Sequence, residues 1–289
     1  MNKFRGFFYG LLSSASFGLI PMFAVPVMAQ GMAFQSVLSY RFMLATVALA
    51  LMLMARKESF RITWQDVPRL CLLAFFYLMS SLFLIWGYEF MASGIATTIH
   101  FMYPVLTTLI MMTVFHEKKS MWRIFAILLA VVGVYLLSVS GGGDHSISIP
   151  GLIVVLLSAL GYALYLVAVN QLKVRSMKGL KLTFYVFLFS TLFLVPGVEI
   201  FSSLEPIKDW DMATNLVLLA LIPTVVSNLS LVEAVKSIGS TLTSVLGAME
   251  PVTAVCVGIL MFHEPLTTQI LIGIGLIITA VTVIILKRS

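Results

Sequence analysis

Long apolar stretches alternate with short polar breaks along the entire chain. A helix that crosses the hydrocarbon core of a bilayer needs about 20 mostly apolar residues. The chain contains ten stretches of roughly this length, separated by Gly, Pro and charged residues. The pattern therefore predicts an all-α integral membrane protein with ten transmembrane helices. The predicted helices cover residues 6–28, 34–55, 68–89, 94–115, 121–140, 150–172, 180–201, 212–233, 239–262 and 266–286.

The charges in the polar breaks are distributed unevenly. If the N-terminus is placed in the cytoplasm, sixteen of the eighteen Lys and Arg fall in segments predicted to be cytoplasmic. The two exceptions are Lys208, in a predicted external loop, and Arg41, within a predicted helix. An excess of Lys and Arg on the cytoplasmic side is the rule for multi-pass membrane proteins. We therefore predict a protein of the cell (inner) membrane with both termini in the cytoplasm.

The composition is that of a chain surrounded by lipid. Only 10% of the residues are charged and 60% are hydrophobic, whereas a soluble domain is about a quarter charged. The excess of cytoplasmic Lys and Arg accounts for the net charge of +6, so we expect the lipid bilayer and no nucleic acid as a partner. Cys71 and Cys256 form no metal-binding spacing. The sequence has neither a Walker loop for ATP nor an H-E-x-x-H zinc motif, so we predict no cofactor, no metal and no enzymatic activity.

Two segments of the chain repeat one another. Tyr103–Glu117 (YPVLTTLIMMTVFHE) and Glu250–Glu264 (EPVTAVCVGILMFHE) share Pro-Val and Phe-His-Glu at the same spacing, 147 positions apart in a chain of 289. We interpret this as a repeat of half the chain, with five helices in 1–140, five in 150–289 and an external linker at 141–149. Because five is an odd number, the two halves must insert with opposite orientation. Inverted repeats of this kind are one architecture of alternating-access transporters.

The two segments also carry a family resemblance. With ten predicted helices and a Pro-Val and a closing Glu in each half, the chain resembles the EamA-like ten-helix permeases of the drug/metabolite transporter superfamily. The residues that carry the resemblance are Ala92–Glu117 and Ile238–Glu264. It implies a secondary transporter that moves a small metabolite, such as an amino acid, often outward. One detail differs, because the family commonly has Gly before the closing Glu and this chain has His116 and His263.

Ionisable side chains within the predicted helices are candidates for function, because their insertion into a bilayer is costly. Glu250 lies about midway along the ninth predicted helix, just before Pro251, which removes a backbone donor and loosens the helix. We predict that Glu250 binds the substrate or a coupling proton. The alternative is a neutral Glu that forms a hydrogen bond across a helix interface. Tyr103 occupies the equivalent position in the first repeat and is a second candidate.

Arg41 and His100 are further candidates of this kind. Arg41 lies about a third of the way into the second predicted helix. It either binds a carboxylate or pairs with Glu250 in a cavity, or it snorkels to the outer interface. His100 shares a helical face with Thr97 and Thr107. We predict that it relays a proton or donates to the substrate, and the alternative is a tautomer fixed by a neighbouring carbonyl.

Uncharged polar residues and the two closing Glu complete the set. Asn228, Tyr162 and Tyr165 are predicted to line the site, although Asn also joins packed helices and the two Tyr rings also suit packing alone. Glu117 and Glu264 are predicted at opposite membrane faces, which argues against a shared central site. We expect each to pair with a nearby helix end or a basic loop residue, with a gating role as the alternative.

These residues define the predicted site and function. The predicted substrate- or proton-binding residues are Glu250, His100, Tyr103, Arg41, Asn228, Tyr162 and Tyr165. The predicted function is secondary active transport of a small metabolite by alternating access, with export and proton coupling as expectations. The alternative is an integral membrane enzyme or a lipid-handling protein, which would turn over a substrate chemically. The sequence leaves open the substrate, the direction, the coupling ion and whether the protein is a monomer or a homodimer.

Overall fold

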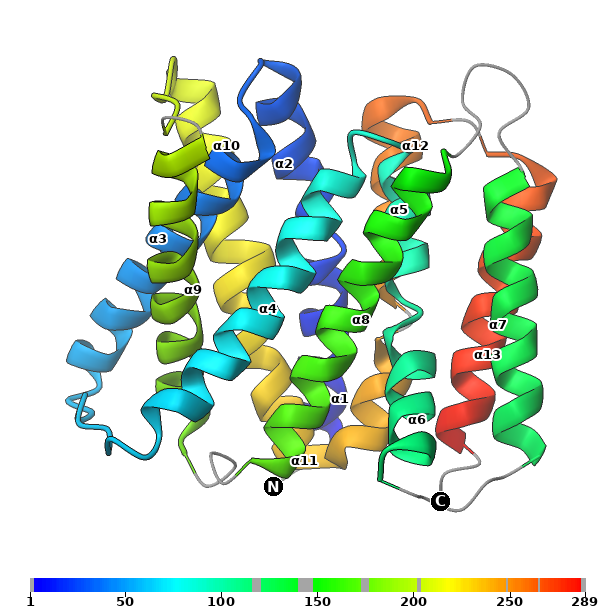
Figure 1. Ribbon diagram of the computed structural model, residues 1–289, viewed down its shortest axis with the longest axis horizontal. Helices are drawn as coiled ribbons and strands as arrows, with labels where there is room; N and C mark the ends of the chain where they lie inside the picture. The colour runs from blue at the N-terminus through cyan, green and yellow to red at the C-terminus, as the bar shows by residue number, and fades with distance from the viewer. Residues whose placement is uncertain are drawn as a thin grey trace.

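The computed structural model describes residues 3–115, 121–139, 148–172, 177–201, 204–247, 249–264 and 266–286. Every regular element in these ranges is a helix (Figure 1). In chain order they are α1 (Lys3–Phe17), α2 (Ile20–Ala29), α3 (Phe34–Ala55), α4 (Val67–Gly87), α5 (Ser93–His100), α6 (Tyr103–Thr113), α7 (Met121–Val139), α8 (Ile149–Gln171), α9 (Gly179–Phe201), α10 (Trp210–Ala220), the π-helix η2 (Leu221–Val226), α11 (Ser227–Leu246), α12 (Met249–Phe262) and α13 (Thr268–Leu286).

Six described stretches are long and apolar enough to cross a membrane. They are Phe4–Ala29, Phe34–Ala55, Val67–Gly87, Ser93–Thr113, Ile149–Val169 and Trp210–Ala234. Three shorter apolar segments lie in α9, α12 and α13. The all-helical, membrane-spanning class is therefore confirmed, and the number of ten spans stays a prediction. The chain enters α1 and leaves α13 at the same end of the bundle (Figure 1).

The predicted helix boundaries are wrong in three places, and two of them concern the repeated segments. The range 6–28 is two helices, α1 and α2, separated at residues 18–19. The range 94–115 is two helices, α5 and α6, separated at residues 101–102. The break predicted at residues 234–238 does not exist, because α11 continues to Leu246 and the chain breaks only before α12. A Pro ring clashes with the carbonyl four residues earlier, so Pro104 and Pro251 explain why both breaks lie just ahead of Pro-Val. Residues 234–238 contain no Pro or Gly that would break a helix.

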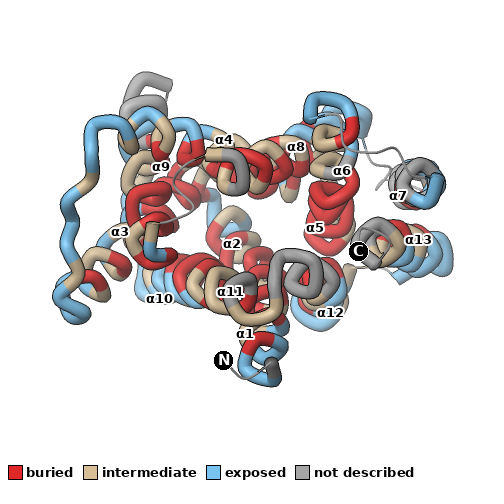
Figure 2. The backbone as a smooth tube through the Cα atoms, turned by 90° about the horizontal axis from the view of Figure 1, so that it is seen from below, coloured by how far each residue is buried: buried red, intermediate tan, exposed pale blue. Residues whose placement is uncertain are grey.

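Each half of the chain packs mainly against the other half. The helix pairs with the most extensive contacts are α1 with α11, α7 with α13, α4 with α8, α3 with α9, α4 with α9 and α5 with α12. Every pair joins a helix from before residue 140 to one from after residue 148. Seen from below in Figure 2, most of these helices form a ring, and α7 and α13 lie together at one edge.

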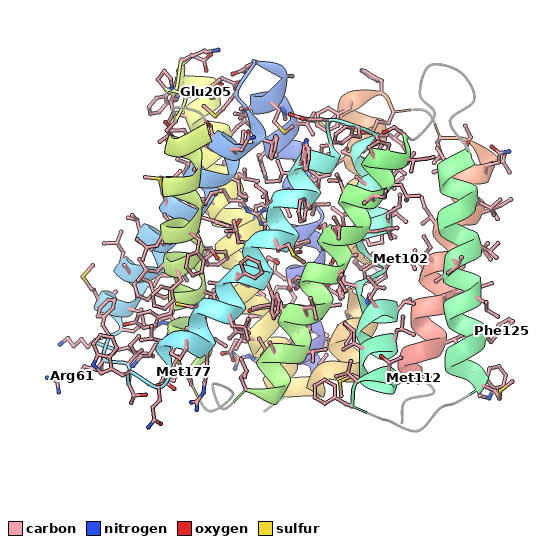
Figure 3. All side chains as sticks on the ribbon, viewed as in Figure 1. Arg61, Met102, Met112, Phe125, Met177 and Glu205 are labelled. Atoms are coloured by element: carbon pink, nitrogen blue, oxygen red, sulfur yellow. The ribbon has the colours of Figure 1, made fainter. Side chains whose placement is uncertain are left out.

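Apolar side chains lie on the outer faces of the bundle as well as in its core. Large apolar side chains point outward, including Leu128 and Leu260 and the Phe125 labelled in Figure 3. Arg41, on the other hand, is 0% exposed. In lipid the apolar side chains face the solvent, and polar groups are tolerated only where protein or water surrounds them. The interior of this bundle is therefore the place to look for a site.

Candidate substrate-binding site

The breaks between α5 and α6 and between α11 and α12 bring the two repeated segments together. Tyr103 is the first residue of α6 and Glu250 is the second residue of α12. Both side chains are buried, and the Tyr103 hydroxyl donates to Glu250 Oε1 at 3.4 Å. The two residues are 147 positions apart, which is the offset of the sequence repeat. Equivalent positions of the two halves thus meet inside the bundle.

Gly18 allows α12 to begin where it does. It lies between α1 and α2, and a Cβ at this position would be 2.6 Å from the Glu250 carbonyl oxygen and 2.7 Å from Thr253 Cβ. Any other residue would therefore push α1 and α12 apart. Small residues such as those from Ser14 to Gly18 let helices pack closely, and this close packing positions the backbone of Glu250.

His100 is the last residue of α5 and is fully buried. Its Nδ1 lies 2.8 Å from Ser158 Oγ, and the Ser158 hydroxyl donates to the Ser80 carbonyl at 2.6 Å. Because a hydroxyl has one proton to donate, Ser158 must accept a hydrogen bond from Nδ1–H. In the neutral ring this leaves the Nε2 lone pair free. A serine, rather than the carbonyl considered from sequence, fixes the tautomer.

Two buried acceptors of this cluster are unsatisfied. Among the described residues, His100 Nε2 and Glu250 Oε2 have no hydrogen-bond partner. A buried polar atom without a partner costs about 1–3 kcal/mol, and most such atoms in folded proteins are paired. Two of them where the two helix breaks meet therefore indicate a place where a ligand or a proton could bind.

Aromatic rings surround and extend this cluster. The Tyr162 ring lies 4.6 Å from that of Tyr103 and 5.6 Å from that of His100, measured between centroids. Tyr165 continues the row, at 5.9 Å from Tyr162 and 5.3 Å from Tyr77. Centroid separations of this size are typical of favourable aromatic pairs. The row leads from the His100–Glu250 cluster to a second polar group.

Arg41 forms that second group together with α10–η2–α11. Its Nε donates to Thr224 Oγ1 at 2.7 Å. Asn228 Nδ2 donates to the Thr224 carbonyl at 2.7 Å and to the Tyr77 hydroxyl at 3.3 Å. Full burial means that Arg41 does not snorkel to the interface. Its hydrogen bond goes to Thr224, and no ion pair with Glu250 occurs in the described part of the chain.

The structure thus divides the seven predicted residues into two groups. Glu250, His100, Tyr103 and Tyr162 belong to the first, Arg41 and Asn228 to the second, and Tyr165 joins them. Sequence reasoning missed Ser158, Thr224 and Tyr77. Thr224 beside Pro223, within an apolar run, is a polar residue that the sequence pattern could have singled out.

Comparison with known proteins gives the family. The model of the EamA-like transporter family matches residues 4–139 and, a second time, residues 149–286. The chain belongs to the EamA-like transporter family. An uncharacterized transporter of Archaeoglobus fulgidus is 22% identical over 88% of this chain and 89% of its own length. The uncharacterized transporter YetK of Bacillus subtilis is 25% identical over 86% of this chain and 77% of its own length.

A solved structure shares the fold. It superimposes with a TM-score of 0.70, covers 96% of this chain and 95% of its own, and is 15% identical in sequence. The family match confirms the resemblance seen in the sequence, and this EamA-like protein is a membrane transporter.

In this EamA-like transporter the closing Glu of the second repeat caps a helix of the first half. The Glu264 carboxylate accepts hydrogen bonds from Ser93 N and Ser93 Oγ, both at 2.7 Å, and from Gly94 N at 3.3 Å. Ala92, the N-cap of α5, offers no side-chain cap of its own. Pairing with a helix end was one of the expected roles. Glu117, the equivalent residue in the first repeat, lies outside the described residues.

His263, the residue before Glu264, replaces the Gly that is common in the EamA-like pattern, and its backbone conformation is unfavourable for His. His263 has φ 53°, in the left-handed region, and Glu264 N donates to the Gly258 carbonyl at 3.0 Å. This bond spans six positions and closes the C-terminal end of α12, and Gly is strongly preferred at a left-handed position just after a helix. His at this position therefore carries a conformational penalty that Gly would not.

A hollow at the surface of this transporter lies apart from the buried groups. It has a volume of about 440 Å³ and is lined by Arg56, Lys57, Glu58, Ser59, Met177, Lys178 and Lys181. Figure 3 labels Met177 at the end of the bundle where the chain begins, and Glu205 at the opposite end. The basic side chains thus gather at the end predicted to be cytoplasmic.

Proposed function

We propose that the protein is a secondary active transporter that moves a small metabolite, such as an amino acid, by alternating access. Ten helices in two inverted halves, with both termini in the cytoplasm, form the framework of this proposal. The substrate binds where the halves meet, at His100, Tyr103 and Glu250, and Tyr162 forms one wall. Export and coupling to protons complete the proposal.

The observation that carries the proposal is the pair of unsatisfied acceptors at the meeting point of the two broken helices. His100 Nε2 and Glu250 Oε2 can each accept a hydrogen bond, and neither has a partner among the described residues. An ammonium or amide group of a substrate would supply N–H donors to both. A carboxyl group at this point can also take up and release a proton, and intramembrane carboxyls mark proton relays in transporters.

The cap formed by Glu264 supports alternating access. It joins the end of α12 to the start of α5, and these helices come from different halves. If one half rocks against the other, this contact must break whenever its end of the bundle opens. Glu264 therefore acts as a latch that is closed in the structure.

Transport in liposomes tests the proposal. Purified protein is reconstituted with a pH gradient and screened by counterflow against amino acids, sugars, nucleosides and organic cations. We expect accumulation of one class, recovered chemically unchanged, that collapses when the gradient is removed. Chemical conversion of the substrate would favour the enzyme alternative instead.

The variant Glu250→Gln tests the coupling. It keeps a polar side chain near Tyr103 but cannot exchange a proton, so we expect gradient-driven accumulation to be lost. The matched control is Glu89→Gln, which neutralises an exposed carboxyl outside the helices and should leave accumulation unchanged. Full gradient-driven transport by Glu250→Gln would contradict the proposed coupling role.

A further inference from the structure

Arg41 is the only buried Lys or Arg among the described residues, and it is 0% exposed. Arg stays protonated in proteins, so burial does not remove its charge. A buried charge is strongly unfavourable unless it is paired and hydrogen-bonded. The atoms around this guanidinium therefore show what compensates it.

The π-helix η2 holds one edge of the guanidinium. Thr224 Oγ1 donates to the carbonyl of Leu219, five residues earlier, at 2.9 Å, and accepts from Arg41 Nε at 2.7 Å. With its single proton committed to Leu219, the hydroxyl can only be the acceptor for Arg41. Short π-helical turns are rare and occur frequently at functional sites. The π-turn thus fixes the orientation of the guanidinium plane.

The other edge has no partner. Among the described residues, neither Nη1 nor Nη2 forms a hydrogen bond, although both atoms are buried. The ionisable groups near enough to act on the charge are Tyr77 and Tyr88, and the Phe42 ring centroid lies 5.9 Å from Cζ. An aromatic ring attracts a cation weakly and accepts no strong hydrogen bond. The Nη1–Nη2 edge is thus fixed in direction and unsatisfied.

We propose that Arg41 is an anion subsite that takes the carboxylate of the transported substrate. This proposal rests on the proposed function and deepens it. The two oxygens of a carboxylate match the two nitrogens of a guanidinium edge. A single buried cation balances a single negative charge, which favours a carboxylate over a phosphate dianion.

The position of the subsite also constrains the rest of the substrate. The rings of Tyr77, Tyr165 and Tyr162 lead from Arg41 to the His100–Glu250 cluster. Arg41 offers only donors, whereas the unpaired atoms of the cluster accept hydrogen bonds. A substrate that fits both ends has a carboxylate at one end, N–H or O–H donors at the other, and an apolar body against the rings.

Binding to purified protein in nanodiscs tests the anion subsite without knowledge of the substrate. The probes are acetate and benzoate, with benzamide, chloride and phosphate at the same concentrations as comparisons, and thermal unfolding as the measurement. We expect the two carboxylates to raise the Tm and benzamide and chloride to leave it unchanged. No shift with either carboxylate, or a shift with phosphate alone, would overturn the proposal.

Variants assign the effect to Arg41. Arg41→Gln should weaken benzoate binding at least tenfold, and Arg56→Gln, which removes an exposed charge, should not weaken it. Thr224→Val keeps the Arg41 charge but removes the acceptor that orients it, so we expect a smaller loss of several-fold. This variant decides the matter if Arg41→Gln does not fold. Unchanged benzoate binding in Arg41→Gln, or in Thr224→Val where Arg41→Gln does not fold, would refute the assignment.

The outcome is separable from the proposed transport mechanism. Glu250→Gln should retain benzoate binding, because its carboxyl belongs to the other polar group. Suppose that Glu250→Gln abolishes transport and that the original protein binds no carboxylate. This result would refute the anion subsite and would still support the transporter proposal.

Discussion

Glu250 and Glu264 stand at the two ends of α12, and their carboxylates have opposite surroundings. Glu264 accepts three hydrogen bonds at the start of α5, two of them at 2.7 Å. Glu250 accepts one long hydrogen bond, at 3.4 Å from Tyr103, and its Oε2 has no described partner. A satisfied carboxylate holds a structure together, whereas an unsatisfied one is available to a ligand or a proton.

The first repeat sharpens the contrast. Its closing residue is also Glu, at Glu117, but its opening residue is Tyr103 in place of Glu250. The element that joins the halves is thus present twice in the sequence, and the carboxyl at the meeting point is present once. This difference between Tyr103 and Glu250 agrees with our proposal that an asymmetric small molecule binds there.

The largest effect is expected from removal of the satisfied carboxylate. Glu264→Ala leaves Ser93 N, Ser93 Oγ and Gly94 N without their acceptor, so we expect a loss of about 2–4 kcal/mol in the free energy of unfolding. Thermal unfolding in detergent measures this loss. Glu205→Ala is the matched control, since its carboxylate accepts a single backbone hydrogen bond, from Ala33 N, and a smaller loss is expected. Equal losses would mean that the inter-half cap has no special weight.

The unsatisfied carboxylate should respond in the opposite way. Glu250→Gln removes no strong hydrogen bond of the resting protein, so the free energy of unfolding should change by less than about 0.5 kcal/mol. The transport rate should fall roughly 10- to 100-fold, because a hydrogen bond to a charged group contributes about 1.5–3 kcal/mol. Rates in liposomes and unfolding curves are measured on the same preparation. If Glu250→Gln lost much stability and transported normally, Glu250 would be a structural residue like Glu264, which would contradict the prediction.

A smaller effect is expected from the residue that orients His100. Ser158→Ala removes the acceptor for Nδ1–H, and the tautomer is no longer fixed. We expect transport to fall about fivefold, corresponding to about 1 kcal/mol, with an altered pH profile, and Ser158→Thr should restore both.

The control for this prediction is Ser190→Ala, which also removes a buried hydroxyl that donates to a carbonyl of α4, that of Ala74, at 3.1 Å. It should lower stability without moving the pH profile. Identical profiles for the two Ala variants would argue that Ser158 only packs.

The smallest effect concerns the left-handed residue beside Glu264. His263→Gly relieves a backbone conformation that L-residues adopt at a cost, so we expect a gain of about 0.5–1 kcal/mol in the free energy of unfolding. His263→Ala should give no such gain, because Ala has a Cβ. Chemical denaturation resolves the difference, and a loss of stability in His263→Gly would show that the imidazole itself contributes.

The sequence by itself determined that the chain is surrounded by lipid, that its two halves repeat and which family it resembles. Lipid requires apolar outward faces and internally hydrogen-bonded helices, and both requirements appear directly in the pattern of residues. The cost of polar groups in lipid also marked Glu250, His100 and Arg41, all of which the structure buries. These inferences succeed because each depends on the local composition of one segment.

Only the tertiary structure decided which polar atoms are satisfied. The partners of His100, Glu264 and Arg41 are 58, 171 and 183 positions away in the chain. No local sequence pattern predicts a hydrogen bond between such distant residues, because the bond forms only when helices from both halves pack together. The same packing separated Arg41 from Glu250, placed Tyr103 against Glu250 and set the π-turn beside Arg41. The unsatisfied atoms that define the candidate site are therefore a property of the fold.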